Sequence, residues 1–159
     1  MQQELLEAKS SANVKKHGYA NWYDYCVNEW GTKWDIGDEH TIVHQDDHMA
    51  SFNFDSAWSP PTVAYGKLQD QGFIVEAMYY EPGMCFCGVF DENGDDCYSF
   101  ENMSSSDVAE TIPLELDQMF GISETMAEYE REEQDEVTTW YKDGVEETGL
   151  TPHKVKSEW

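Results

Sequence analysis

The spacing of apolar positions along this chain changes between a helical and a strand-like period. Between residues 20 and 30 the apolar side chains recur at the spacing of one helical face, at Trp22, Tyr23, Cys26, Val27 and Trp30. Gly31 follows as a C-terminal stop signal. The pattern predicts an aromatic helix over about 20–30. Such a face needs a cover, and a sheet built from residues 40–100 is expected to supply it.

The first hundred residues contain several more elements of both kinds. We expect a short helix over 1–17, whole or broken at 10–13, and a hairpin from segments 41–44 and 50–58. Ser59 followed by two prolines predicts a helix start, and Gly72 its end. Three strands are predicted next, with Asn93-Gly94 as a hairpin signal, at 73–80, 84–90 and 97–100.

The composition changes after residue 100. Ser104 is a predicted cap of a short helix, and a helical pattern runs from Leu114 to Val137. Gly121 marks a break in that pattern, and Ser123 is the predicted cap of the helix that follows. Turns are predicted at 142–144 and at 151–152.

This order of elements predicts an α+β fold in which an antiparallel sheet carries helices on one face. It is compatible with a ferredoxin-like layout in a permuted or extended form. We expect one domain over 1–100 with an N-terminal helix. Residues 101–159 are expected to form an acidic, mainly helical extension that is packed on this domain or stands beside it.

The formal net charge is −24, from 33 acidic against 9 basic residues in 159. Such a charge repels nucleic acids and anionic membranes and attracts basic surfaces. No apolar run approaches the length of a membrane span, and the N-terminus lacks the basic start and apolar stretch of a signal peptide. The expectation is a cytoplasmic protein that binds neither membrane nor nucleic acid directly.

Four tryptophans, at Trp22, Trp30, Trp34 and Trp58, are predicted to form the structural core. The alternative for the last three is a surface on which bases stack. That function needs a basic surround, and the chain provides the opposite, so core packing is favoured. Lys33, a rare base here, is interpreted as an ion-pair donor rather than a catalytic amine.

Metal binding has two weak candidates. His40, His44 and His48 recur every four residues, but β-branched neighbours favour a strand and a turn, on which the three rings would not converge. Cys85 and Cys87 lack the usual spacing of zinc ligands and are interpreted as buried thiols. We therefore predict no metal and no cofactor.

Other chemical motifs are also weak. The acidic segment 91–96 has its glycine in the fourth rather than the sixth place of a calcium loop, so a hairpin turn is preferred. No nucleophile stands in a recognisable motif, and no glycine-rich phosphate loop is present. The sequence thus predicts no catalytic residue, and an enzyme of unrecognised type is the least favoured function.

Two pentads, Trp30-Gly31-Thr32-Lys33-Trp34 and Ala57-Trp58-Ser59-Pro60-Pro61, carry a family resemblance. Together with Asn21–Tyr25 they make residues 18–100 similar to the YubB-type ferredoxin-like domain of plasmid and phage proteins. That family is functionally uncharacterised and brings no catalytic residues. The resemblance implies a mobile-element accessory protein, and it does not extend to residues 101–159.

The strongest candidate for a partner surface is the acidic run at Glu124, Glu128, Glu130, Glu132, Glu133, Asp135 and Glu136. Its simplest interpretation is a solvated helix face, and a halophilic origin is another. The sharper hypothesis is a substitute for DNA phosphates. A compact chain of this length spans about 40 Å, over which duplex DNA carries about 24 charges.

We therefore expect a non-enzymatic phage or plasmid protein in the host cytoplasm. Its partner would be a basic, nucleic-acid-binding host protein, such as a restriction or CRISPR effector. The alternative is a structural or self-assembling module whose acidity serves solubility.

Overall fold

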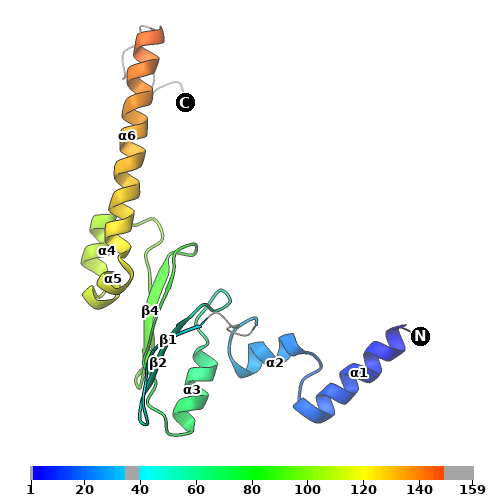
Figure 1. Cartoon of the computed structure of the whole chain (residues 1–159). Helices are drawn as coiled ribbons and strands as arrows, with labels where there is room; N and C mark the ends of the chain where they lie inside the picture. Colours follow the sequence, from blue (N-terminus) through cyan, green and yellow to red (C-terminus); the bar gives the residue numbers. More distant parts are fainter. Residues whose placement is uncertain (1, 35–39, 149–159) are drawn as a thin grey trace. The chain divides into compact units, whose positions relative to one another are not determined.

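The computed structural model describes residues 2–34 and 40–148, and describes side chains within 2–34 and 41–135. The fold is α+β with antiparallel strands, as predicted (Figure 1). By internal contacts the chain divides into two compact units, Met1–Cys97 and Tyr98–Trp159.

The first unit begins with two helices. Helix α1 (Gln2–His17) is continuous, so the break considered at 10–13 is wrong, and none of its residues is buried. The serine and asparagine there each lower helix propensity by less than about 1 kcal/mol, too little to break a helix rich in Leu, Ala and Lys. Helix α2 (Trp22–Glu29) confirms the predicted aromatic helix, with Asn21 as its cap: the side chain accepts from the Asp24 N–H at 2.9 Å.

The end of α2 is joined closely to the start of α3 (Thr62–Asp70). Gly31 has φ +83°, and a Cβ there would lie 2.9 Å from Cγ2 of Val63, so the glycine is required by both conformation and space. The Ala64 N–H also donates to the carbonyl oxygen of Trp30 at 3.3 Å. These contacts fix the two helices to each other.

Helix α3 starts two residues later than predicted. Ser59 does not cap it; the Ser59 carbonyl instead accepts from the Ser56 hydroxyl at 2.7 Å, which closes a separate turn. The predicted stop is confirmed, with Gly72 at φ +94° after the last turn.

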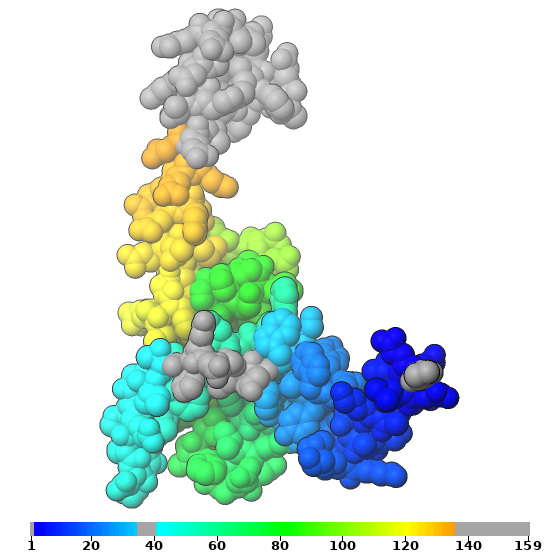
Figure 2. Space-filling model, turned by 45° about the vertical axis from the view of Figure 1, so that its right-hand side comes forward, coloured from blue at the N-terminus to red at the C-terminus, as the bar shows by residue number. Residues whose placement is uncertain are grey.

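The predicted hairpin is confirmed in β1 (His40–Gln45) and β2 (Ala50–Phe54), an antiparallel pair with an irregularity between Ile42 and His44. Asp46 closes the turn, because its Oδ1 accepts from the backbone N–H groups of His48 and Met49 at 2.7 and 2.8 Å. The residues of this turn are exposed, and the hairpin, coloured cyan, lies at the surface of the face shown in Figure 2.

The second sheet has the order β3-β4-β5. Strand β3 (Ala77–Glu81) is only the second half of the predicted strand 73–80. The register explains this correction: Ala77 pairs with Phe90, and β4 (Phe86–Asp91) ends one residue later. Residues 73–75 would therefore lie opposite positions beyond the end of β4 and have no strand residue to pair with, and Ile74 is 88% exposed.

A two-residue turn joins β4 to β5 (Gly94–Ser99), as the Asn93-Gly94 signal predicted. Helix α3 lies on this sheet: the ring of Tyr65 packs 5.2 Å from that of Phe90, and the Gln69 side chain donates to the Asp91 carbonyl at 2.8 Å. The strands described here pair into two separate sheets. The single sheet of a ferredoxin-like layout is not seen among these pairs.

The second unit contains α4 (Ser105–Thr111), α5 (Leu114–Phe120) and α6 (Ile122–Thr148). Ser104 caps α4 as predicted, in a capping box with Asp107. The break at Gly121 is also confirmed by its φ of +61°, but Ser123 lies inside α6 rather than capping it. The helical backbone continues through 142–144, where a turn was predicted, because one interior glycine costs a helix only about 1 kcal/mol. The turn predicted at 151–152 lies outside the described residues.

Candidate functional site

The acidic run lies on α6, which is held by a small apolar core of the second unit. Val108 on α4, Leu116 on α5 and Ile122 at the start of α6 are each fully buried. Ile112 and Phe100 are 4% exposed. Burying such side chains stabilises the unit by roughly 1.5–3 kcal/mol each, as an upper estimate. The first turns of α6 are thus anchored by packing.

Two carboxylates reinforce this packing. Asp117 on α5 accepts from the backbone N–H and the hydroxyl of Ser123, at 2.7 and 2.6 Å. Glu130 on α6 accepts from the backbone N–H and the hydroxyl of Ser105, both at 2.7 Å. Each carboxylate satisfies an N–H group at the start of a helix, which has no partner within its own helix.

These hydrogen bonds change the acidity of the groups. The Ser105 hydroxyl and then its N–H hold the pKa of Glu130 below the usual value, against an opposing effect of Asp107. The pKa of Asp107 is itself lowered by the hydroxyl and N–H of Ser104. Glu130 therefore belongs to the structural contact between α4 and α6, although it was predicted as a partner-binding residue.

The remaining members of the predicted site lie on α6. The side chains of Glu124, Glu128, Glu132, Glu133 and Asp135 are exposed along α6. The side chain of Glu136 lies outside the described residues. Arg131 is the one base within this run of the sequence, and its Nε donates to the Ala127 carbonyl at 3.0 Å. These exposed acids thus lie on one helix whose first turns are anchored.

The prediction of a tryptophan core is wrong for three of its four members. Trp22, Trp34 and Trp58 are 63, 44 and 65% exposed, and Trp30 is half-buried. Helix α2 has only eight residues, and Cys26 is its one buried residue. The described core of the first unit comes instead from smaller residues and the sheet, at Cys26, Ala57, Cys87 and Phe90, with Thr32 as a buried polar side chain.

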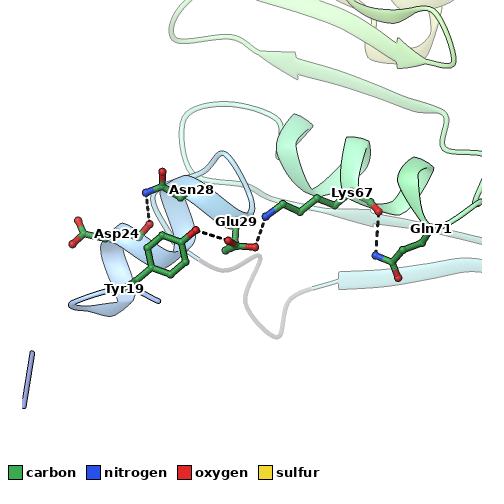
Figure 3. A network of polar contacts seen from close by, with 6 residues as sticks. All are labelled: Tyr19, Asp24, Asn28, Glu29, Lys67 and Gln71. Atoms are coloured by element: carbon green, nitrogen blue, oxygen red, sulfur yellow. Dashed lines mark hydrogen bonds and ion pairs between the residues drawn. The ribbon is translucent and has the colours of Figure 1, made fainter. Parts of the chain in front are cut away.

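A polar network that the sequence did not predict connects α2 and α3 (Figure 3). Lys67 on α3 forms an ion pair with Glu29, and the Tyr19 hydroxyl donates to the other Glu29 oxygen at 2.5 Å. Lys67, followed by Tyr19, lowers the pKa of Glu29, and Glu29 in turn raises the pKa of Tyr19. Lys67 and Glu29 are 38 positions apart in the chain, so only the fold reveals the pair.

Lys33 was interpreted as an ion-pair donor, but its ammonium nitrogen lies over the Trp34 ring, 5.2 Å from the centroid. This is a cation–π contact. The sequence signal for it, a Lys-Trp dipeptide, is too common to have singled it out.

The histidine and cysteine candidates do not form a metal site within the described part of the chain, where no group of three potential ligands lies close together. His44 pairs with Asp46 at 3.1 Å, and the strand and turn separate it from the other two histidines along the backbone. Cys87 is buried as predicted, whereas Cys85 is half-buried in a turn at φ +53°. The segment 91–96 is a hairpin turn, as preferred over a calcium loop.

No family model, no curated protein and no solved structure matches this chain. The resemblance to the YubB-type domain therefore stays a prediction. Among the described helices, none combines the length and apolar character that crossing a membrane requires.

Proposed function

We propose that this protein binds a basic surface of a nucleic-acid-binding protein, with the acids of α6 in the place of DNA phosphates. The observation that carries the proposal is the group of exposed carboxylates on a helix whose start is anchored by the core of its own unit. Its partner would be a host defence protein of the restriction or CRISPR type, in the host cytoplasm. The role would be that of a non-enzymatic accessory protein of a phage or plasmid.

The charge spacing on α6 supports this proposal. Glu124 and Asp135 are eleven positions apart, which corresponds to about 17 Å at 1.5 Å per residue. The five exposed acids over that length, Glu130 left out, give one charge per roughly 3.3 Å, close to the value of about 3.4 Å for one strand of DNA. A basic groove that fits a phosphate backbone would thus meet a similar charge density on α6.

Anchoring also favours binding. Because α4 and α5 hold the start of α6, the helical backbone that carries these acids is already formed before a partner arrives. Less conformational entropy is then lost on association than for a disordered acidic tail. The attraction should weaken steeply with salt, since exposed charges are screened beyond about 8 Å at physiological ionic strength.

A matched pair of variants tests the proposal. The first neutralises Glu124, Glu128, Glu132 and Glu133 to Gln. The second neutralises four exposed acids of the first unit instead, at Glu7, Asp47, Asp70 and Glu92, to the corresponding amides. Both lose the same charge, so they separate the α6 surface from net charge.

The measurement is recovery of bound proteins from host lysate by each tagged variant, with duplex DNA as competitor. We expect the native chain to recover a nucleic-acid-binding protein that DNA or high salt releases. The α6 variant should lose it and the control variant should retain it. Equal recovery by both variants contradicts the α6 site, and recovery that DNA does not compete contradicts phosphate mimicry.

A second candidate function is self-association through the first unit. It is favoured by the exposed apolar side chains of the β1–β2 hairpin at Ile42, Val43, Met49 and Phe52. Isolated two-stranded hairpins are marginally stable, and their apolar faces normally contact another surface. Sedimentation at increasing concentration checks this: a monomer throughout excludes self-assembly as the function. An enzyme remains the least favoured of the three classes.

A further inference from the structure

Trp58 is displayed on the surface by a strained backbone. Its φ is +69°, in the left-handed region that bulky side chains rarely adopt, and its side chain is 65% exposed. The residue before it, Ala57, is 5% exposed, and the Ser56 hydroxyl closes the turn on the Ser59 carbonyl at 2.7 Å. The buried alanine and the closed turn hold the indole outward.

Trp22 offers a comparison within the same unit. It is 63% exposed, but it begins a regular helix and carries no backbone strain. An exposed residue in a regular helix needs no functional explanation. A tryptophan that is both exposed and strained is different, because such strain persists only where the surrounding structure enforces it and is concentrated at functional sites.

The charge of the protein favours a cationic ligand at Trp58. In sequence, Trp34 follows Trp30 by four positions and Trp58 precedes Ala64 by six, and the Ala64 N–H donates to the Trp30 carbonyl. At Trp34 this part of the protein already binds a cation to an indole face, that of Lys33. A nucleic-acid base would also stack on an indole, but the net charge of −24 repels phosphates.

We infer that Trp58 is a stacking site for an arginine side chain of a basic protein segment. Arginine fits better than lysine because its guanidinium is planar, stacks on aromatic faces and is more weakly hydrated. This inference rests on the proposed function, since it assumes a basic partner, and it adds a second contact in the first unit. The partner would present at least one accessible arginine besides the basic groove that α6 occupies.

The test uses the full chain and a fluorescein-labelled peptide of alternating arginine and glycine, with a lysine counterpart of the same length. Affinities are measured by fluorescence polarisation at low salt. Trp58→Gly should weaken binding of the arginine peptide about 5-fold, the effect of a cation–π contact at an exposed site. Its effect on the lysine peptide should be smaller.

Stability provides a second measurement. Because glycine adopts positive φ without strain, Trp58→Gly should raise the melting temperature by about 4 °C while it weakens binding. Trp22→Ala is the matched control, since it removes an equally exposed tryptophan from a regular helix, and it should leave arginine-peptide affinity unchanged. Trp58→Phe should retain part of the affinity.

The outcomes separate this inference from the proposed function. If Trp58→Gly binds the arginine peptide like the native chain, or if Trp22→Ala weakens binding equally, the Trp58 site is wrong. Equal losses for the two peptides overturn the assignment to arginine. If neutralising the acids of α6 weakens peptide binding and Trp58→Gly does not, the proposed function is supported and the Trp58 site is wrong. Loss at Trp58, with none at α6, supports this site and contradicts the proposed function.

Discussion

Replacing Gly88 by alanine should destabilise the first unit more than any other glycine-to-alanine change there. Gly88 on β4 lies opposite Tyr79 on β3. The tyrosine ring crosses the glycine, and its hydroxyl donates to Asp95 on β5 at 2.6 Å. A Cβ at Gly88 would lie 2.2 Å from the Tyr79 oxygen and 2.5 Å from the Asp96 carbonyl oxygen. Neither distance is sterically possible, so Tyr79 and the β4–β5 backbone must both move.

The size of the effect follows from these two displacements. Overpacking costs about 2 kcal/mol, and loss of the hydrogen bond to Asp95 costs about 1 kcal/mol more. A loss of about 3 kcal/mol lowers the melting temperature of a unit of this size by about 15 °C. Burial, with Asp95 and Cys97, also raises the pKa of Tyr79. In Gly88→Ala that pKa should return toward its ordinary value.

Thermal unfolding by circular dichroism and a spectroscopic titration of the tyrosines measure the two effects. Gly66→Ala is the matched control, because Gly66 lies in α3 and a Cβ added to it would meet no atom within 4 Å. This control variant should be more stable than the native chain by about 1 kcal/mol, the difference in helix propensity. A melting temperature for Gly88→Ala at or above that of the native chain would refute the crossing of Tyr79 over Gly88.

Three further predictions concern titrating groups. Glu130→Gln should lower the stability of the second unit, whereas Glu128→Gln should not. The lowered pKa of Glu130 adds stability that is present above about pH 4.5 and lost as pH falls. In urea unfolding, the free energy of unfolding of Glu130→Gln should therefore decrease less on acidification than that of the native chain. Lys67→Met should destabilise the first unit slightly, because Glu29 loses its ion pair. Adding Glu29→Gln to this variant should restore part of the lost stability. Burial raises the pKa of Tyr65 to about 12, so stability should fall from about pH 10 to 12 as the unfolded chain ionises first, and Tyr65→Phe should remove that loss in alkaline unfolding curves.

Local signals in the sequence predicted the elements well. Ser104 as a cap and the breaks at Gly72 and Gly121 are confirmed because each depends on a few neighbouring residues. The strand was predicted to begin too early, at residue 73, because its length depends on where β4 ends. The side chains of 73–76 carry no information about that.

The candidate site was predicted in part. The exposed acids of α6 follow from charge and helical spacing alone. The hydrogen bonds of Glu130 to Ser105, 25 positions away, cannot be predicted in this way, since nothing local distinguishes Glu130 from its acidic neighbours. The prediction of a tryptophan core was wrong for another reason. Large apolar side chains suggest a core, but whether they are buried depends on which elements pack against them. Here an eight-residue helix buries a cysteine and leaves Trp22 in solvent.

The strand pairings have a consequence for how the chain folds. β1 pairs with β2, and β3, β4 and β5 follow one another in the second sheet, so these strand neighbours are also consecutive in sequence. Only short loops must close before each pairing forms, and such low contact order speeds folding. We expect each hairpin to form as soon as its second strand leaves the ribosome, so that the first unit is largely folded before the end of α6 leaves the ribosome.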